Sequence, residues 1–151
     1  MHIVETGCVR RPGAWIDDGQ STIIWDWIIG RVGGTARSFD ISKDSVSACR
    51  AMVKNVEVIE SDSITGLRGL SNLKDIDLLF LDSYDATGDY RAPLHHLSEL
   101  ACVYENLRSG CMIAVDDCER YFGKDRYVNA FFLDNGVAPV LKSYVNIWVK
   151  P

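Results

Sequence analysis

The fold is decided by the stretch Ile3-Val4-Glu5-Thr6-Gly7, which runs on to Gly19-Gln20-Ser21-Thr22. This pattern predicts a short buried strand, an acidic turn, a glycine-containing loop and the first turn of a helix. Glycines at such a junction let the backbone approach a ligand closely, and the start of a helix presents free N–H groups. By itself the pattern is weak, so its interpretation depends on later segments in which an apolar strand again ends in an acid.

Apolar segments of strand length alternate with segments of helical periodicity along the rest of the chain. We expect strands at residues 36–41, 56–60, 76–81 and 111–115, with helices between them. The helix after Ser21 has Ile24, Trp27 and Ile28 at helical spacing. Residues 137–141 and 144–149, separated by a short turn, predict an antiparallel hairpin. The alternation implies one α/β domain over residues 1–151, with a doubly wound, mostly parallel sheet and right-handed crossovers.

Composition and charge restrict the classes of function. The chain is 47% hydrophobic and 25% charged, as in soluble globular domains, and its net charge of -5 disfavours nucleic acid as a partner. No apolar run approaches the roughly 20 residues that span a bilayer, and no signal-peptide pattern is evident. The five cysteines are odd in number and form no CxxC pair. We therefore expect a cytoplasmic protein with reduced thiols and no membrane partner.

Acidic residues follow the ends of five expected strands. They are Glu5, Asp40, Asp62, Asp82, Asp116 and Asp117. The carboxyl ends of parallel strands meet at one edge of a sheet, and the ligand crevice of a doubly wound fold lies there. Carboxylates gathered at one edge repel one another unless ligand donors or a cation compensate. Any one of them could instead cap the helix that follows, so both interpretations stay open for single residues.

The positions of these acids suggest particular partners. Asp40, at the end of the second strand, suits a carboxylate that accepts hydrogen bonds from the ribose hydroxyls of an adenosine ligand. Asp62 and Ser63 could meet an adenine edge. Asp82, Asp116 and Asp117 offer three oxygen ligands from neighbouring strand ends, the hard donor set expected for Mg²⁺ or a similar ion. A solvated turn is the alternative for Asp116 and Asp117.

These residues and their order resemble class I S-adenosylmethionine-dependent methyltransferases. The resemblance rests on Glu5-Thr6-Gly7, Asp40, Ser61-Asp62-Ser63, Asp82 and Asp116-Asp117 with the final hairpin, and it covers Ile3 to Val149. Leu81-Asp82-Ser83-Tyr84 and Val115-Asp116-Asp117 are similar to the divalent-metal branch that includes catechol O-methyltransferase and relatives of cephalosporin hydroxylase. The resemblance implies a Rossmann-like fold, S-adenosylmethionine and Mg²⁺ as cofactors, and a small hydroxylated acceptor such as a sugar or a catechol-like compound.

The resemblance also implies roles for residues. Glu5, Gly7 and Ser21 would line the methionine end of the cofactor, Asp40 the ribose, and Asp62 and Ser63 the adenine. Asp82, Asp116 and Asp117 would hold the metal, and Asp82 would thereby take part in catalysis. Three departures limit this assignment: a long loop before Gly19, Tyr84-Asp85 where the catechol branch has a catalytic lysine, and no lid helices before the first strand.

The general base is not identified by the resemblance, and two other functions stay open. His95 and His96 follow a loop near the expected rim, so we consider both as catalytic candidates, although a place on a helix surface would explain them equally well. The same architecture serves nicotinamide-dependent oxidoreductases, but the chain lacks a compact GxGxxG. A non-catalytic accessory subunit would explain the missing lid. Bulky residues such as Trp25 and Trp27 also suggest a homodimer.

Overall fold

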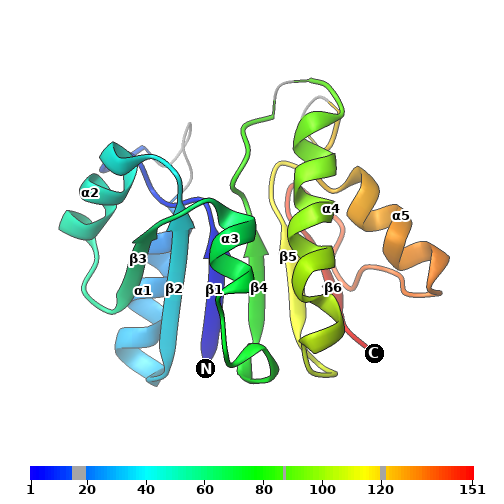
Figure 1. The fold of residues 1–151 in the computed structure, drawn as a ribbon, viewed down its shortest axis with the longest axis horizontal. Helices are drawn as coiled ribbons and strands as arrows, with labels where there is room; N and C mark the ends of the chain where they lie inside the picture. Colours follow the sequence, from blue (N-terminus) through cyan, green and yellow to red (C-terminus); the bar gives the residue numbers. More distant parts are fainter. Residues whose placement is uncertain (15–19, 87, 120–121) are drawn as a thin grey trace.

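The computed structural model describes residues 1–14, 20–86, 88–119 and 122–151, so Gly19 of the opening loop lies outside the described residues. Six strands form a single sheet in the order β3-β2-β1-β4-β5-β6 (Figure 1). Their bounds are β1 His2–Thr6, β2 Thr35–Asp40, β3 Val56–Glu60, β4 Leu78–Leu81, β5 Met112–Val115 and β6 Asn146–Val149. The first five are parallel, and β6 runs antiparallel to β5. The predicted mostly parallel sheet with a C-terminal antiparallel pair is confirmed.

Helices cover both faces of this sheet. The helices α1 (Ser21–Val32) and α2 (Lys43–Met52) pack on one face. The other face carries α3 (Ser63–Arg68), α4 (Arg91–Val103) and α5 (Arg126–Asp134), and two short 3-10 helices, Leu73–Asp75 and Tyr104–Asn106, connect elements. Figure 1 shows α3 and α4 in front of the sheet and α1 behind it. The doubly wound prediction is therefore confirmed.

Alternation along the buried strands divides the core into two layers. Successive side chains of a strand point to opposite faces, so Leu79 and Leu81 of β4 pack with α3, α4 and α5, whereas Leu78 and Phe80 pack with α1 and α2. At the edge of the sheet, the completely buried Trp148 of β6 stacks on Phe132 of α5, with ring centroids 5.2 Å apart. This stacking fixes α5 against the end of the sheet.

The C-terminal hairpin is shorter than the sequence predicts. Residues 137–141 form no strand; an isolated bridge joins Leu141 to Ile147 of β6, and the Val140 N–H donates to the Ile147 carbonyl at 2.8 Å. Pro139 has no N–H to donate to a strand ladder, which explains why regular pairing stops there.

The buried side of α1 also differs from the predicted spacing. Ile24 and Trp27 are 43% and 58% exposed, while Thr22 and Ile29 are buried. Trp25 turns toward the sheet instead, where its ring meets the ring of Phe80 edge-on at 5.4 Å. The cause is polar: the indole Nε1 of Trp25 donates a hydrogen bond to Glu5, which sets the rotation of the helix. The exposed Trp27 leaves the homodimer as a prediction.

None of the helices in the described part of the chain is long and apolar enough to cross a membrane. All five cysteines are free thiols, as the sequence predicts.

Candidate functional site

A tight turn at Gly7 follows the carboxyl end of β1. Gly7 adopts a φ of +84°, and a Cβ atom there would lie 2.4 Å from the carbonyl oxygen of Asp82. Only glycine fits both conditions. The Gly7 N–H donates to the Phe39 carbonyl at 2.8 Å, and the Ser38 hydroxyl donates to the Gly7 carbonyl at 2.8 Å. The turn is thus held between the ends of β2 and β4.

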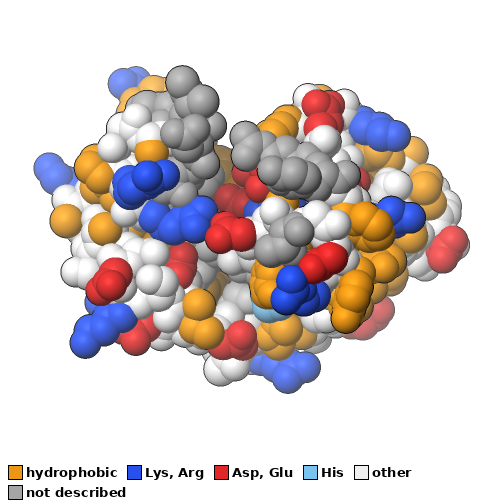
Figure 2. Space-filling model, turned by 90° about the horizontal axis from the view of Figure 1, so that it is seen from above, with side chains coloured by type: hydrophobic (Ala, Val, Ile, Leu, Met, Phe, Trp, Pro, Cys, Tyr) orange, Lys and Arg blue, Asp and Glu red, His pale blue; other side chains and the backbone are white. Residues whose placement is uncertain are grey.

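A cavity of about 200 Å³ lies over the carboxyl ends of β1, β2, β3 and β4. Its lining consists of Gly7, Phe39, Asp40, Ile41, Asp62, Ser63, Ser83, Tyr84 and His95. Four of the residues predicted to bind the cofactor, Gly7, Asp40, Asp62 and Ser63, therefore surround one cavity. Figure 2 views the molecule from this side and shows acidic side chains gathered near a central hollow.

The two carboxylates of this cavity are already engaged by the backbone. Asp40 accepts from the N–H of Ser42 at 2.7 Å and of Cys8 at 3.2 Å. Asp62 caps α3 by accepting from the N–H and the hydroxyl of Thr65, both at 2.9 Å, and the hydrogen bond from the Thr65 backbone lowers the pKa of Asp62. The capping interpretation thus holds for Asp62, which lines the cavity as well. Both carboxylates are oriented before any ligand arrives.

Glu5 and Ser21 lie elsewhere than the other predicted cofactor residues. Glu5 is 1% exposed and accepts hydrogen bonds from the Thr22 hydroxyl at 2.7 Å and from Trp25 Nε1 at 2.8 Å. Burial raises the pKa of its carboxyl group. Glu5, a buried residue of β1, therefore fixes the first turns of α1 through these two hydrogen bonds. Ser21, the first residue of α1, lines a second cavity of about 390 Å³ together with Asp116 and Tyr144.

The three predicted metal ligands do come together. Asp82, Asp116 and Asp117, called here the acidic trio, each offer a carboxylate oxygen, and these oxygens lie within 4.8 Å of one another. Asp117 has a φ of +55°, a left-handed conformation that few residues other than glycine adopt. The Tyr144 hydroxyl donates a hydrogen bond to Asp117. Burial is the main cause that raises the pKa of Asp82, to about 7, and Lys124 acts in the opposite direction.

Lys124 is a member of this site that sequence reasoning missed. Its Nζ donates to Asp82 Oδ1 at 2.7 Å and lies 3.0 Å from Asp117 Oδ2, and its side chain is only 3% exposed. In the sequence it stands in a polar segment, Gly123-Lys124-Asp125-Arg126, which is typical of a solvated loop. No periodicity or spacing marks it. An ammonium group held by two of the three carboxylates, Asp82 and Asp117, shows that this donor set attracts a cation, so the trio fits a hard divalent ion.

The two candidate histidines point in different directions from α4. His95 lines the smaller cavity, where its Nε2 lies 3.0 Å from the Ser63 hydroxyl and 3.3 Å from Glu99 Oε1. The hydrogen bond to Glu99 raises the pKa of His95. His96 is completely buried, and burial lowers its pKa to about 4. Its Nδ1 lies 2.7 Å from the Ala92 carbonyl oxygen. His96 therefore lies in the core and does not line the cavity, so a catalytic role for it stays a prediction.

Glu99 is a second residue that the sequence did not reveal. It is completely buried on α4 and accepts from the Ser83 hydroxyl at 2.5 Å while it orients His95. One turn of helix separates Glu99 from His95, a spacing that could have signalled the pair.

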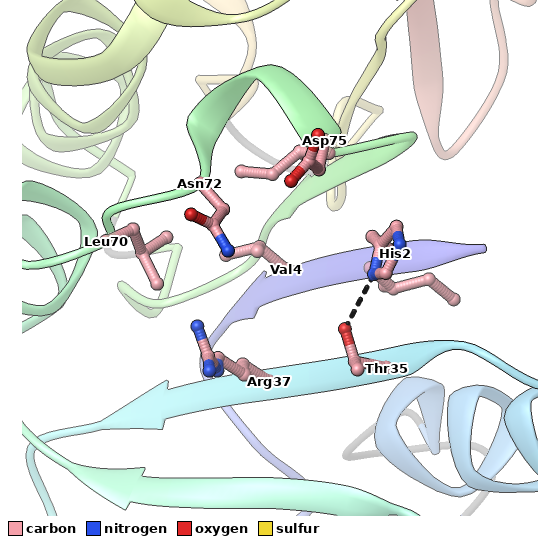
Figure 3. Close-up of a pocket in the computed structure, with 9 residues that line it drawn as sticks. His2, Val4, Thr35, Arg37, Leu70, Asn72 and Asp75 are labelled. Carbon is pink, nitrogen blue, oxygen red and sulfur yellow. Dashed lines mark hydrogen bonds between the residues drawn. The ribbon is translucent and has the colours of Figure 1, made fainter.

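Another hollow, of about 130 Å³, lies at the opposite end of the strands (Figure 3). His2 and Thr35, which line it, are joined by a hydrogen bond of 2.9 Å. None of the predicted site residues lines this hollow. The carboxyl ends of the strands therefore remain the candidate site.

Comparisons with known proteins bear on the fold of the chain. No protein-family model and no curated protein matches the sequence. Among solved structures, the methyltransferase MycE of the mycinamycin pathway, in complex with Mg, SAH and mycinamycin VI, superposes with a TM-score of 0.69 at 13% identity, over 99% of this chain and 44% of MycE. A proposed methyltransferase from Streptococcus mutans in complex with SAH gives 0.65 at 13% identity, over 99% of this chain and 88% of that one. The O-methyltransferase NovP gives 0.65 at 13% identity, over 99% and 71%.

These likenesses define the fold. The chain has the class I methyltransferase fold, as the resemblance in the sequence implied. It spans less than half of the length of MycE.

Proposed function

We propose that this chain is an S-adenosylmethionine-dependent methyltransferase. The single observation that carries the proposal is the cavity that gathers Gly7, Asp40, Asp62 and Ser63 over the strand ends. A turn that only glycine can make, a carboxylate at the end of β2 and a carboxylate at the end of β3 suit the amino-acid, ribose and adenine parts of that cofactor in this order. Structures with this fold that hold SAH support the proposal.

The acceptor in this proposal is a hydroxyl group of a small molecule, assisted by a divalent metal such as Mg²⁺. Asp82, Asp116 and Asp117 would hold the metal. When bound, such an ion lowers the pKa of a coordinated hydroxyl and so produces a better nucleophile. The chain itself contributes alignment, because Gly7 and Asp82 are in contact and thereby fix the cofactor cavity next to the trio.

The acceptor would enter from the side of α1. The larger cavity is mostly apolar, with Ile24, Trp25 and Phe80 in its walls, and Asp116 and Tyr144 belong to its lining too. An acceptor with an apolar or planar body could lie against these walls and present its hydroxyl to the trio. Tyr144 is fixed toward Asp117 by its hydrogen bond and would orient that hydroxyl.

The test is calorimetric titration of S-adenosylhomocysteine into the purified protein, with and without Mg²⁺. We expect micromolar binding, and we expect Asp40→Ala to weaken it about 10- to 100-fold, because hydrogen bonds to a charged group contribute roughly 1.5–3 kcal/mol. Asp134→Ala is the matched control, since it removes the same charge from the exposed end of α5. Absence of binding to the wild type, or unchanged affinity in Asp40→Ala, would refute the assignment.

Two further results would each support a different function. Tight binding of NAD without binding of S-adenosylhomocysteine would indicate a nicotinamide-dependent oxidoreductase. Cofactor binding without turnover of any hydroxylated acceptor would favour an accessory subunit.

A further inference from the structure

We propose that Lys124 is an internal cation of the acidic trio, and that a divalent metal binds there by displacing its ammonium group from Asp82 and Asp117. This inference rests on the proposed function, because it concerns the metal site of that proposal. It assigns a role to a buried charged residue that methyl transfer alone does not explain.

The contacts of Lys124 are those of a resident counter-ion. Its Nζ lies 2.7 Å from Asp82 and 3.0 Å from Asp117, and 3% of its side chain is exposed. A buried ammonium is stable only when carboxylates pair with it, and partly buried carboxylates that lie this close together need a cation to offset their repulsion. Lys124 therefore allows the three carboxylates to remain close together when no metal is present.

The backbone around Lys124 is fixed, whereas its side chain has a long flexible stem. Gly123 adopts a φ of +74°, and a Cβ atom there would lie 3.0 Å from the Cys118 carbonyl oxygen. Asp125 is tied to β6, because the Asn146 side-chain amide donates to it at 2.7 Å. The four-carbon stem of lysine can nevertheless rotate its ammonium group away from the trio without moving these anchors.

A divalent ion and the ammonium group compete for the same oxygens. Mg²⁺ takes carboxylate oxygens at about 2.0–2.1 Å, so an ion bound to Asp82 and Asp117 would lie within about 5 Å of an ammonium that stayed on them. The Coulomb repulsion between charges of +2 and +1 at that distance is several times RT, even at an effective dielectric constant of about 20. Binding of the metal therefore favours the arrangement in which Lys124 has left.

The experiment compares Lys124→Met with the wild type after treatment with a chelator. Methionine keeps an unbranched side chain, one atom shorter than that of lysine, and removes its charge. Mn²⁺ binding, followed by the electron paramagnetic resonance signal of the free ion, should be about tenfold or more tighter in Lys124→Met. The melting temperature in chelator should be lower than that of the wild type, and Mn²⁺ should raise it by more. Lys74→Met, on an exposed 3-10 helix at the opposite end of the sheet, is the control for net charge and should match the wild type.

Each outcome decides the inference. Equal or weaker Mn²⁺ binding by Lys124→Met would overturn it while leaving the metal-assisted function in place. Absence of Mn²⁺ binding by both proteins, with S-adenosylhomocysteine still bound, would overturn the inference together with the metal part of the proposed function. If Lys124→Met fails to fold in chelator, the wild type alone can be tested by a crystal structure with Mn²⁺. Lys124 Nζ should then have left Asp82 and Asp117, and an ammonium that remains on both would overturn the proposal.

Discussion

Substituting Gly7 by alanine tests the turn on which the cofactor cavity depends. The added Cβ atom would lower the stability of the folded protein in two ways. The φ of +84° costs an L-residue about 1–2 kcal/mol. The contact of 2.4 Å with the Asp82 carbonyl oxygen is made to backbone, which cannot rotate away, so the strand ends must move at a cost of about 1–3 kcal/mol. We therefore expect Gly7→Ala to lower the free energy of unfolding by about 2–5 kcal/mol.

A second glycine separates these two costs. Gly136, after α5, has a φ of +74°, and apart from its chain neighbours no heavy atom of the described residues lies within 4 Å of the position of a Cβ. Gly136→Ala should therefore lose only the conformational part, about 1–2 kcal/mol. Urea unfolding of both variants measures the difference, and titration with S-adenosylhomocysteine should show weaker binding for Gly7→Ala alone. Equal destabilisation by the two substitutions would refute the close approach of β1 to the end of β4.

Two other predictions concern buried groups. The raised pKa of Glu5 means that the folded protein holds a proton that the unfolded chain has released above pH 4.5. Stability should therefore fall as pH rises from there through the raised pKa. Urea unfolding between about pH 4 and about pH 8 should show a flatter pH dependence for Glu5→Gln than for the wild type. A slope identical to that of the wild type would contradict the assignment. Trp148→Ala should cost about 3–5 kcal/mol in urea unfolding, because it removes the buried ring that stacks on Phe132, whereas a loss below about 1 kcal/mol would contradict that packing.

The parts of the fold that the sequence predicted correctly are those that depend on local pattern. Apolar strands such as Leu78–Leu81 are buried on both faces, so their composition alone marks them. Because parallel strands place their carboxyl ends together, the acids that follow these strands had to meet at one edge. Asp82, Asp116 and Asp117 could be grouped in this way without any knowledge of side-chain contacts.

The parts that could not be predicted depend on single polar contacts between distant segments. Lys124 lies 42 residues from Asp82 in sequence, and nothing in a polar loop indicates that its ammonium is buried. The rotation of α1 depends on one hydrogen bond between Trp25 and Glu5, and so hydrophobic spacing placed Ile24 and Trp27 on the wrong side. His95 and His96 are adjacent on α4, yet His95 lines the cavity and His96 is buried in the core. The sequence alone did not distinguish the two.

The strand order has a consequence for synthesis on the ribosome. The strand β1 comes first in the chain, yet it lies in the middle of the sheet and pairs with both β2 and β4. Its partner β4 begins at Leu78, so the nascent chain must carry β1 with one side unpaired until that residue has emerged. The acidic trio assembles later still, because Asp117 and Lys124 follow β5. Vectorial synthesis thus completes the scaffold of the cofactor cavity before it completes the cation site.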